Sequence, residues 1–68
     1  MQFTYMNHEV KSAVRVLELI EYLAGCAEPV SLKEITQELG YPKSSTHALA
    51  QTLVARGYVI QDLSLIHI

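Results

Sequence analysis

Hydrophobic residues recur every three or four positions in three successive segments of this chain, a spacing that places them on one face of an α-helix. The first segment covers residues 12–25, with Ser12 as the predicted N-cap and Gly25 as the predicted end of the helix. Its predicted buried stripe consists of Ala13, Val16, Leu17, Ile20, Leu23 and Ala24. Leu19 and Tyr22 lie off the stripe, so they are either ordinary exposed side chains or a surface that covers a neighbouring chain.

The second segment has the clearest helix start in the chain. Ser31 and Glu34 have the spacing of a capping box, in which each side chain bonds to the backbone amide of the other residue. The predicted inward stripe of this helix is Leu32, Ile35, Thr36 and Leu39. Gly40 supplies a left-handed residue that ends the helix, and Pro42 can begin a helix but cannot continue one. We therefore expect a sharp turn before the third segment.

The third segment, about residues 42–55, shows the helical spacing twice, in opposite phases. The inward set is Thr46, Leu49, Ala50 and Leu53, and the outward set is Ser44, His47, Ala48 and Gln51. Gly57 ends this helix, and residues 58–61 have the pattern of a short strand that forms one side of a wing and pairs with an extended piece around residues 29–30. The predicted fold is mainly α, a three-helix winged helix-turn-helix with a short or incomplete β wing.

The distribution of charge matters more than its total. The chain has 68 residues and a net charge of −2, which by itself argues against a nucleic-acid partner. Six of its seven carboxylates, however, lie between Glu9 and Glu38, and the seventh is Asp62. The window between Glu38 and Asp62 holds Lys43, His47 and Arg56 and no carboxylate, so it is the one locally cationic part of the chain.

Composition excludes several classes of protein. A chain that is 50% hydrophobic and 18% charged is not disordered, and no apolar run approaches the ~20 residues that cross a bilayer. Residues 1–9 carry no secretory signal, so we expect the cytoplasm. Cys26 is the only cysteine, and His8, His47 and His67 lie too far apart for a local ligand pair, so we expect no disulfide, no metal and no cofactor. A domain this small gains from dimerisation.

The outward face of the third helix suits contact with DNA. A helix that is held by its apolar face can present short hydrogen-bonding side chains to the major groove. Lys43, Ser44 and Ser45 lie in the first turn, where free amides and the positive helix end favour phosphate. His47 and Gln51, one turn apart, point toward base edges, and Gln is suited to bidentate pairing with adenine. We expect Arg56 to contact a phosphate or to cap the helix.

Two runs of residues point to a known family. Leu-Gly-Tyr-Pro-Lys-Ser-Ser-Thr-His at residues 39–47 is followed by Arg-Gly-Tyr-Val at residues 56–59. Together with the start of the second helix, these runs resemble the N-terminal winged helix-turn-helix domain of IclR-type bacterial transcription regulators, over residues 10–62. The resemblance implies sequence-specific binding of double-stranded DNA. The positions that it implies reach DNA are those of Lys43, Ser44, Ser45, His47 and Gln51.

The same resemblance implies features of the full-length protein and exposes two departures. Family members are homodimers in which a separate C-terminal domain binds a small organic acid or similar metabolite, so this chain alone is not expected to sense an effector. Many members have Arg directly after the His, where this chain has Ala48 and lacks a candidate contact to guanine. Residues 63–68 replace the usual wing tip and returning strand, and resemble read-through into foreign DNA. We therefore expect an arm at residues 1–9, the domain at residues 10–62 and an atypical, artefactual tail at residues 63–68.

Three other interpretations compete with DNA binding. Ser44, Ser45, His47 and Gln51 could simply solvate an exposed helix. The winged fold could instead serve as a protein-interaction or dimerisation module, which salt dependence would distinguish because only phosphate contacts weaken steeply with salt. An enzyme would need Ser44 or Ser45 as nucleophile and His47 as base, but no carboxylate lies nearby to orient the imidazole, and the chain is small for an enclosed pocket. We do not expect an enzyme.

Overall fold

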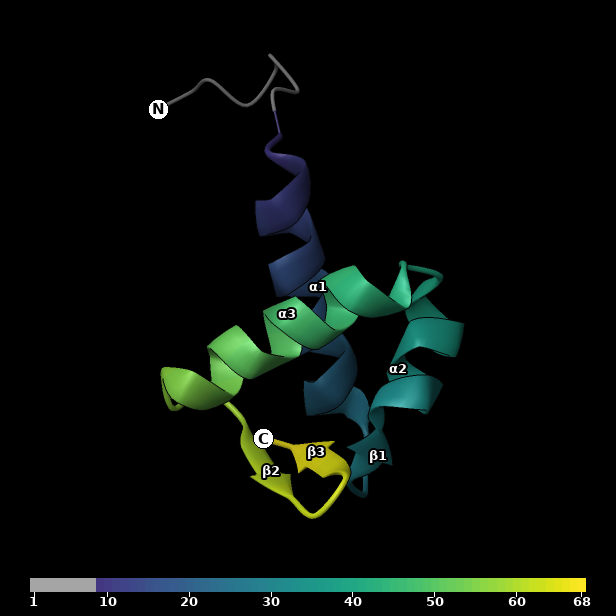
Figure 1. Cartoon of the computed structure of the whole chain (residues 1–68), viewed down its shortest axis with the longest axis vertical. Helices are drawn as coiled ribbons and strands as arrows, with labels where there is room; N and C mark the ends of the chain where they lie inside the picture. Colours follow the sequence, from purple (N-terminus) through teal and green to yellow (C-terminus); the bar gives the residue numbers. More distant parts are fainter. Residues whose placement is uncertain (1–8) are drawn as a thin grey trace.

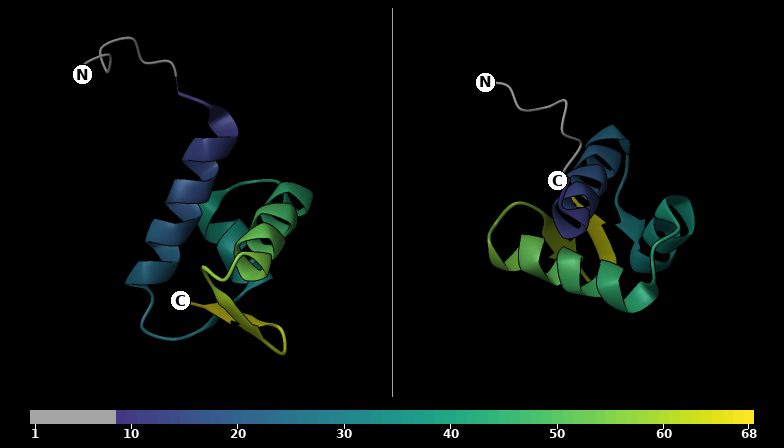
Figure 2. Two further views of the ribbon diagram at one scale, coloured as in Figure 1. Left: turned by 90° about the vertical axis from the view of Figure 1, so that its left-hand side faces the viewer. Right: turned by 90° about the horizontal axis from the view of Figure 1, so that it is seen from above.

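The computed structural model describes residues 9–68, and the predicted arm at residues 1–9 therefore lies outside the described residues except for Glu9. Three helices and three short strands follow one another in the order α1, β1, α2, α3, β2, β3 (Figure 1). Figure 2 shows α2 and α3 on one side of α1, with the small sheet at the end where α1 finishes. The predicted winged helix-turn-helix, mainly α with a short wing, is confirmed.

Helix α1 spans Lys11–Gly25, and it differs from the prediction at its start and in its buried face. Its N-cap is Val10, which makes no side-chain capping bond, so the prediction that Ser12 caps the helix is wrong. The predicted end at Gly25 is confirmed, and the Cys26 amide donates to the Leu23 carbonyl there over 3.1 Å.

The buried stripe of α1 is centred on Leu19, which is 1% exposed, and on Leu23, which is 3% exposed. Leu17, predicted to face inward, is 58% exposed, and the predicted surface position of Leu19 is wrong. Val16, Ile20 and Tyr22 pack against the buried residues. Apolar residues surround much of this helix, so spacing alone allows two neighbouring stripes. Contact with α2 and β3 selects the one that contains Leu19.

Helix α2 spans Leu32–Leu39 and begins as predicted. The Glu34 amide donates to the Ser31 hydroxyl over 3.1 Å, and the Ser31 amide donates to a Glu34 carboxylate oxygen over 2.8 Å. Gly40 has a φ of +73° and its amide donates to the Thr36 carbonyl over 2.8 Å. The capping box and the left-handed glycine therefore set both ends of α2 by local interactions.

Helix α3 spans Lys43–Ala55, with Pro42 at its N-cap. It ends in a Schellman motif, in which the Tyr58 amide donates to the Leu53 carbonyl and the Gly57 amide to the Val54 carbonyl, over 2.9 and 3.1 Å. Gly57 has a φ of +83°, which explains the glycine at this position. The predicted helix and its glycine stop are confirmed.

The sheet contains β1 (Val30–Ser31), β2 (Ile60–Asp62) and β3 (Leu65–His67), in the order β1-β3-β2 with both pairs antiparallel. The predicted pairing of residues 58–61 with residues 29–30 is therefore wrong, because β3 lies between β1 and β2. Residues 63–68 differ in sequence from the wing tip and returning strand of the family. They nevertheless form a returning strand, β3. Within β3, Ile66 is 3% exposed and joins the core, so the folded unit extends past residue 62.

One hydrophobic core joins all three helices and the sheet. Its buried members are Leu19, Leu23, Ile35, Ala50, Leu53, Val59 and Ile66. Thr46 is also fully buried, and its hydroxyl donates to the Pro42 carbonyl over 3.0 Å. The core therefore holds α3 by its inner face and leaves its outer face free.

The capping assignments predict different effects for two serines. Ser31→Ala removes the capping oxygen of α2 and is expected to lower the free energy of unfolding by about 1 kcal/mol. Ser12→Ala is the matched control, because Ser12 is exposed inside α1 and caps nothing, so it should be neutral or slightly stabilising. Urea unfolding followed by circular dichroism measures both. An equal loss in the two variants would contradict these assignments.

Candidate nucleic-acid interface

The two faces predicted for α3 are present in the structure. Thr46, Ala50 and Leu53 have exposed fractions of 0%, 1% and 5% and form the inner face. The exposed side chains of the predicted site are Lys43, Ser44, His47, Ala48, Gln51 and Arg56, and Ser45 is half-buried. The inner face cannot turn outward without exposing the core, so the outer side chains keep fixed positions relative to the fold. Their contacts with DNA stay a prediction.

The start of α3 is electropositive. Lys43 is its first residue, no acidic residue lies in its first turn, and Pro42 makes no side-chain capping bond. The first amides of the helix therefore have no side-chain partner, and the positive end of the helix dipole adds to the charge of Lys43. Ser44 and Ser45 add hydroxyls in the same turn. This combination can bind an anion such as a phosphate group.

Arg15 is a further cation near the start of α3, and the sequence alone did not predict that it lies there. Its guanidinium carbon lies 4.8 Å from the centre of the Tyr41 ring, a cation–π contact that joins α1 to the turn between α2 and α3. Arg15 also lines a hollow of about 230 Å³ together with Ser12, Ser45, Ala48 and Leu49. The sequence signal was an arginine inside an apolar helical stretch, but only the fold brings it beside Ser45 and Ala48.

The outer face of α3 also contacts the wing. The Gln51 side chain donates from Nε2 to Oε1 of Gln61 in β2, over 3.2 Å. The sequence predicts no role for Gln61, because only the fold brings β2 beside α3. Arg56 lies at the opposite end of α3 from Lys43, where its backbone amide donates to the Thr52 carbonyl over 3.0 Å.

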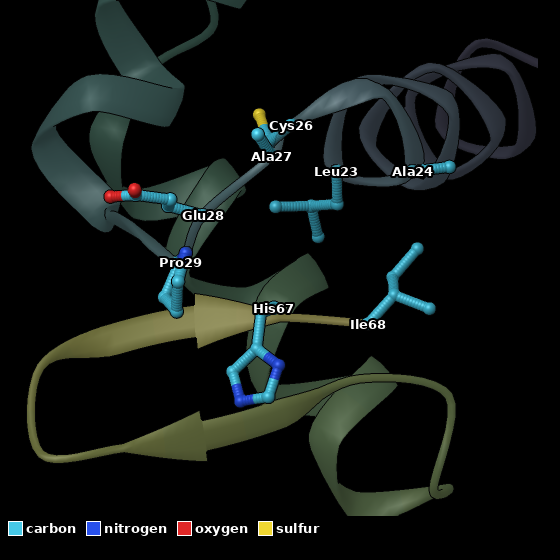
Figure 3. Close-up of a pocket in the computed structure, with 8 residues that line it drawn as sticks. All are labelled: Leu23, Ala24, Cys26, Ala27, Glu28, Pro29, His67 and Ile68. Carbon is cyan, nitrogen blue, oxygen red and sulfur yellow. The ribbon is translucent and has the colours of Figure 1, made fainter.

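A second hollow, of about 290 Å³, lies between the end of α1 and β3 (Figure 3). It is lined by Leu23, Ala24, Cys26, Ala27, Glu28, Pro29, His67 and Ile68. In Figure 3 the side chains of Cys26, Glu28 and His67 point in different directions and do not converge on one point. Within residues 9–68, no three His, Cys, Asp or Glu side chains gather closely enough to hold a metal ion.

Tyr22 lies near this hollow and packs against the core. Desolvation by burial raises the pKa of its hydroxyl above the ordinary value of 10.0, and the Cys26 side chain and the carboxylates of Glu38 and Glu34 act in the same direction. Tyr22 is therefore neutral at pH 7 and serves as a packing residue.

In the part of the chain that the structure describes, no helix combines the length and apolar character needed to cross a bilayer.

Comparison with known proteins assigns this arrangement to a family. Residues 12–63 match the family described as the IclR helix-turn-helix domain. The chain belongs to the IclR helix-turn-helix family. This is a family of transcription-regulator domains that bind DNA through a helix-turn-helix, and it is not an enzyme family. The match includes all of α1 except its first residue, both helices of the helix-turn-helix, and β2.

Two curated proteins are similar to the chain over 53 residues, each with 40% identity. They are the transcriptional repressor IclR of Escherichia coli (strain K12) and the acetate operon repressor of Salmonella typhimurium (strain LT2). The aligned part is 78% of this chain but only 19% of each relative. No solved structure shows a significant match to the chain.

The contact between Arg15 and Tyr41 predicts a measurable coupling within this IclR domain. In a double-mutant cycle, Arg15→Met and Tyr41→Leu should show a coupling energy of about 0.5–1 kcal/mol in the free energy of unfolding. Arg15→Met with Tyr58→Leu is the control cycle, because Tyr58 is 65% exposed and no cation of residues 9–68 lies over its ring. Chemical denaturation provides the values. Simple additivity in the Tyr41 cycle would show that the cation–π contact contributes nothing.

Proposed function

We propose that this chain binds double-stranded DNA in a sequence-specific manner, with α3 as the recognition helix in the major groove. The observation that carries the proposal is the division of α3 into a buried inner face and a polar outer face. Membership of the IclR helix-turn-helix family supports it, and both relatives are named as repressors. An α-helix fits the width of the major groove, so an exposed helix face of this kind can reach base edges.

The outer face divides into phosphate-binding and base-reading parts. Lys43, Ser44 and Ser45 bind backbone phosphate at the start of α3, where the helix dipole adds to the charge of Lys43. His47 and Gln51 read base edges one turn further along, and Gln51 pairs with adenine. Ala48 offers only a methyl group, which suits contact with the methyl group of thymine rather than with guanine.

Two arginines extend the phosphate contacts. Arg15 flanks the start of α3 and Arg56 its end, so the two cations bracket the base-reading side chains along the helix. Phosphate contacts at both ends of a recognition helix fix its register on the duplex but carry no sequence information themselves. Binding should therefore be strong only at low salt for a single copy of the domain.

We further propose that the regulator that carries this domain acts as a homodimer. Two copies of α3 would then lie about one helical turn apart on a palindromic site. The chain spans 19% of the length of each curated relative, and we propose that a small-molecule effector acts through a domain other than this one.

A protein-interaction module is the second candidate. Exposed apolar side chains favour it, namely Leu17 at 58%, Ile60 at 56% and Leu63 at 91%. The burial of Leu19 removes one of the residues that the sequence offered for such a surface. The two candidates differ in salt dependence, because association through apolar side chains does not release counterions.

Lys43→Ala tests the phosphate-binding role. The variant should bind all duplexes more weakly, and the slope of log K against log salt concentration should become shallower by about one unit. Lys43→Arg is the matched control, because it keeps the charge and should keep the slope. Fluorescence anisotropy with several unrelated duplexes over a range of salt concentrations measures both effects. Binding by the unaltered chain that does not respond to salt would favour the protein-interaction module instead.

His47→Ala and Gln51→Ala test the base-reading role. Both variants should relax the preferred site while still binding duplex DNA, because they remove base contacts and leave the phosphate contacts in place. Selection from random duplexes followed by sequencing gives the preferred site of each chain. Gln37→Ala is the control, since Gln37 is exposed on α2 and not on α3. Unchanged preferred sites in both α3 variants would contradict the proposed recognition helix.

A further inference from the structure

The hydrogen bond between Gln51 and Gln61 connects two surfaces with different tasks. Gln51 lies on the outer face of α3, and Gln61 lies in the edge strand β2. Both side chains are exposed, so the bond from Gln51 Nε2 to Gln61 Oε1, 3.2 Å long, stabilises the fold only slightly. Its importance is that it holds the Gln51 side chain against the wing.

The backbone of Gln61 is held by the sheet. It pairs with Ile66 of β3, and residues directly opposite each other in an antiparallel pair point to the same face. Ile66 points into the core, so the Gln61 side chain projects from the face of the sheet that packs on the helices. The alternation along β2 directs Ile60 and Asp62 to the other face. The sheet therefore sets the face from which Gln61 projects, and Gln61 contacts Gln51 from that face.

The bond leaves Gln51 able to read a base. Its Nε2 carries two hydrogens, and Gln61 accepts only one of them, so one N–H donor and the Oε1 acceptor remain free. Adenine offers an acceptor at N7 and a donor at N6 in the major groove, which matches one donor and one acceptor. A rotation of the amide by half a turn exchanges the donor and the acceptor, and would allow other base edges to pair. Gln61 opposes a rotation of the Gln51 amide alone, because the bond is then kept only if the Gln61 amide turns as well.

We propose that Gln61 is a positioning residue that restrains the side chain of Gln51 and thereby sharpens the preference of the recognition helix for adenine. This inference rests on the proposed function, in which Gln51 reads a base. It assigns to the wing strand β2 a role in specificity that acts through α3 and requires no contact of Gln61 with DNA.

The test uses the unaltered 68-residue chain and the duplex that it selects. The measured quantity is the ratio of dissociation constants between that duplex and duplexes in which the adenine read by Gln51 is replaced. Gln61→Met removes the acceptor and keeps the length of the side chain. Immobilising a flexible side chain on binding costs conformational entropy, which corresponds to about two- to tenfold in affinity. We therefore expect the ratio to fall by about two- to tenfold in Gln61→Met.

Three variants distinguish positioning from direct contact. Gln61→Glu keeps an oxygen acceptor but adds a negative charge, so it should weaken binding to all duplexes and retain the ratio. In a Gln51→Ala background, Gln61→Met should change neither the affinity nor the ratio. Gln37→Met makes the same chemical change on α2 and should leave the ratio unchanged. Loss of affinity from Gln61→Met in the Gln51→Ala background would show that Gln61 contacts DNA itself, and would overturn the proposal.

A measurement without DNA tests the hydrogen bond directly. In the ¹⁵N-labelled free chain, Gln61→Met should shift the side-chain amide resonances of Gln51, while the backbone amide of Leu53 on the buried face keeps its position. Unchanged Gln51 side-chain resonances would overturn the proposal.

The failures of the two proposals are distinguishable. If the unaltered chain shows no adenine preference that depends on Gln51, the proposed base-reading role fails and this inference fails with it. If that preference exists and survives unchanged in Gln61→Met, only the positioning role of Gln61 is overturned.

Discussion

The burial of one face of α3 is the constraint on which the other features of this domain depend. Thr46, Ala50 and Leu53 are almost fully enclosed, so the helix cannot rotate about its axis without losing apolar contacts. A helix fixed in rotation is a precise support for side chains on its opposite side. Recognition of base edges requires such precision, because hydrogen bonds weaken steeply when the angle at the hydrogen falls below about 120°.

The surface at the start of α3 is shaped by electrostatics as well as by packing. The chain as a whole is acidic, with a net charge of −2, yet the start of α3 carries Lys43, free amides and the neighbouring Arg15. The total charge of a small domain therefore says little about its partner, and the charge on one helix says more. The same region contains the shallow hollow beside Ala48, where a longer residue would close the space between α1 and α3.

Local signals in the sequence predicted α2 and α3 well, whereas contacts between distant segments could not be predicted. Ser31, Glu34, Gly40 and Gly57 act on neighbouring backbone groups, and these interactions can be recognised from spacing alone. The buried stripe of α1 was misplaced because Leu17 and Leu19 both satisfy helical spacing, and only packing chooses between them. The outer face of α3 was predicted correctly in its exposure, while Arg15 and Gln61 depended on which elements meet in the fold. Residues 63–68 were expected to lie outside the domain because they depart from the family pattern, but Leu65–His67 form a strand of the sheet.

The position of β3 has a consequence for how the domain folds. This strand lies in the middle of the sheet, between β1 and β2, but it comes after both in the chain. It also supplies Ile66 to the core that the three helices share. The helices alone therefore leave the core open beside β1, and cooperative folding of the domain requires the strand that follows all of them.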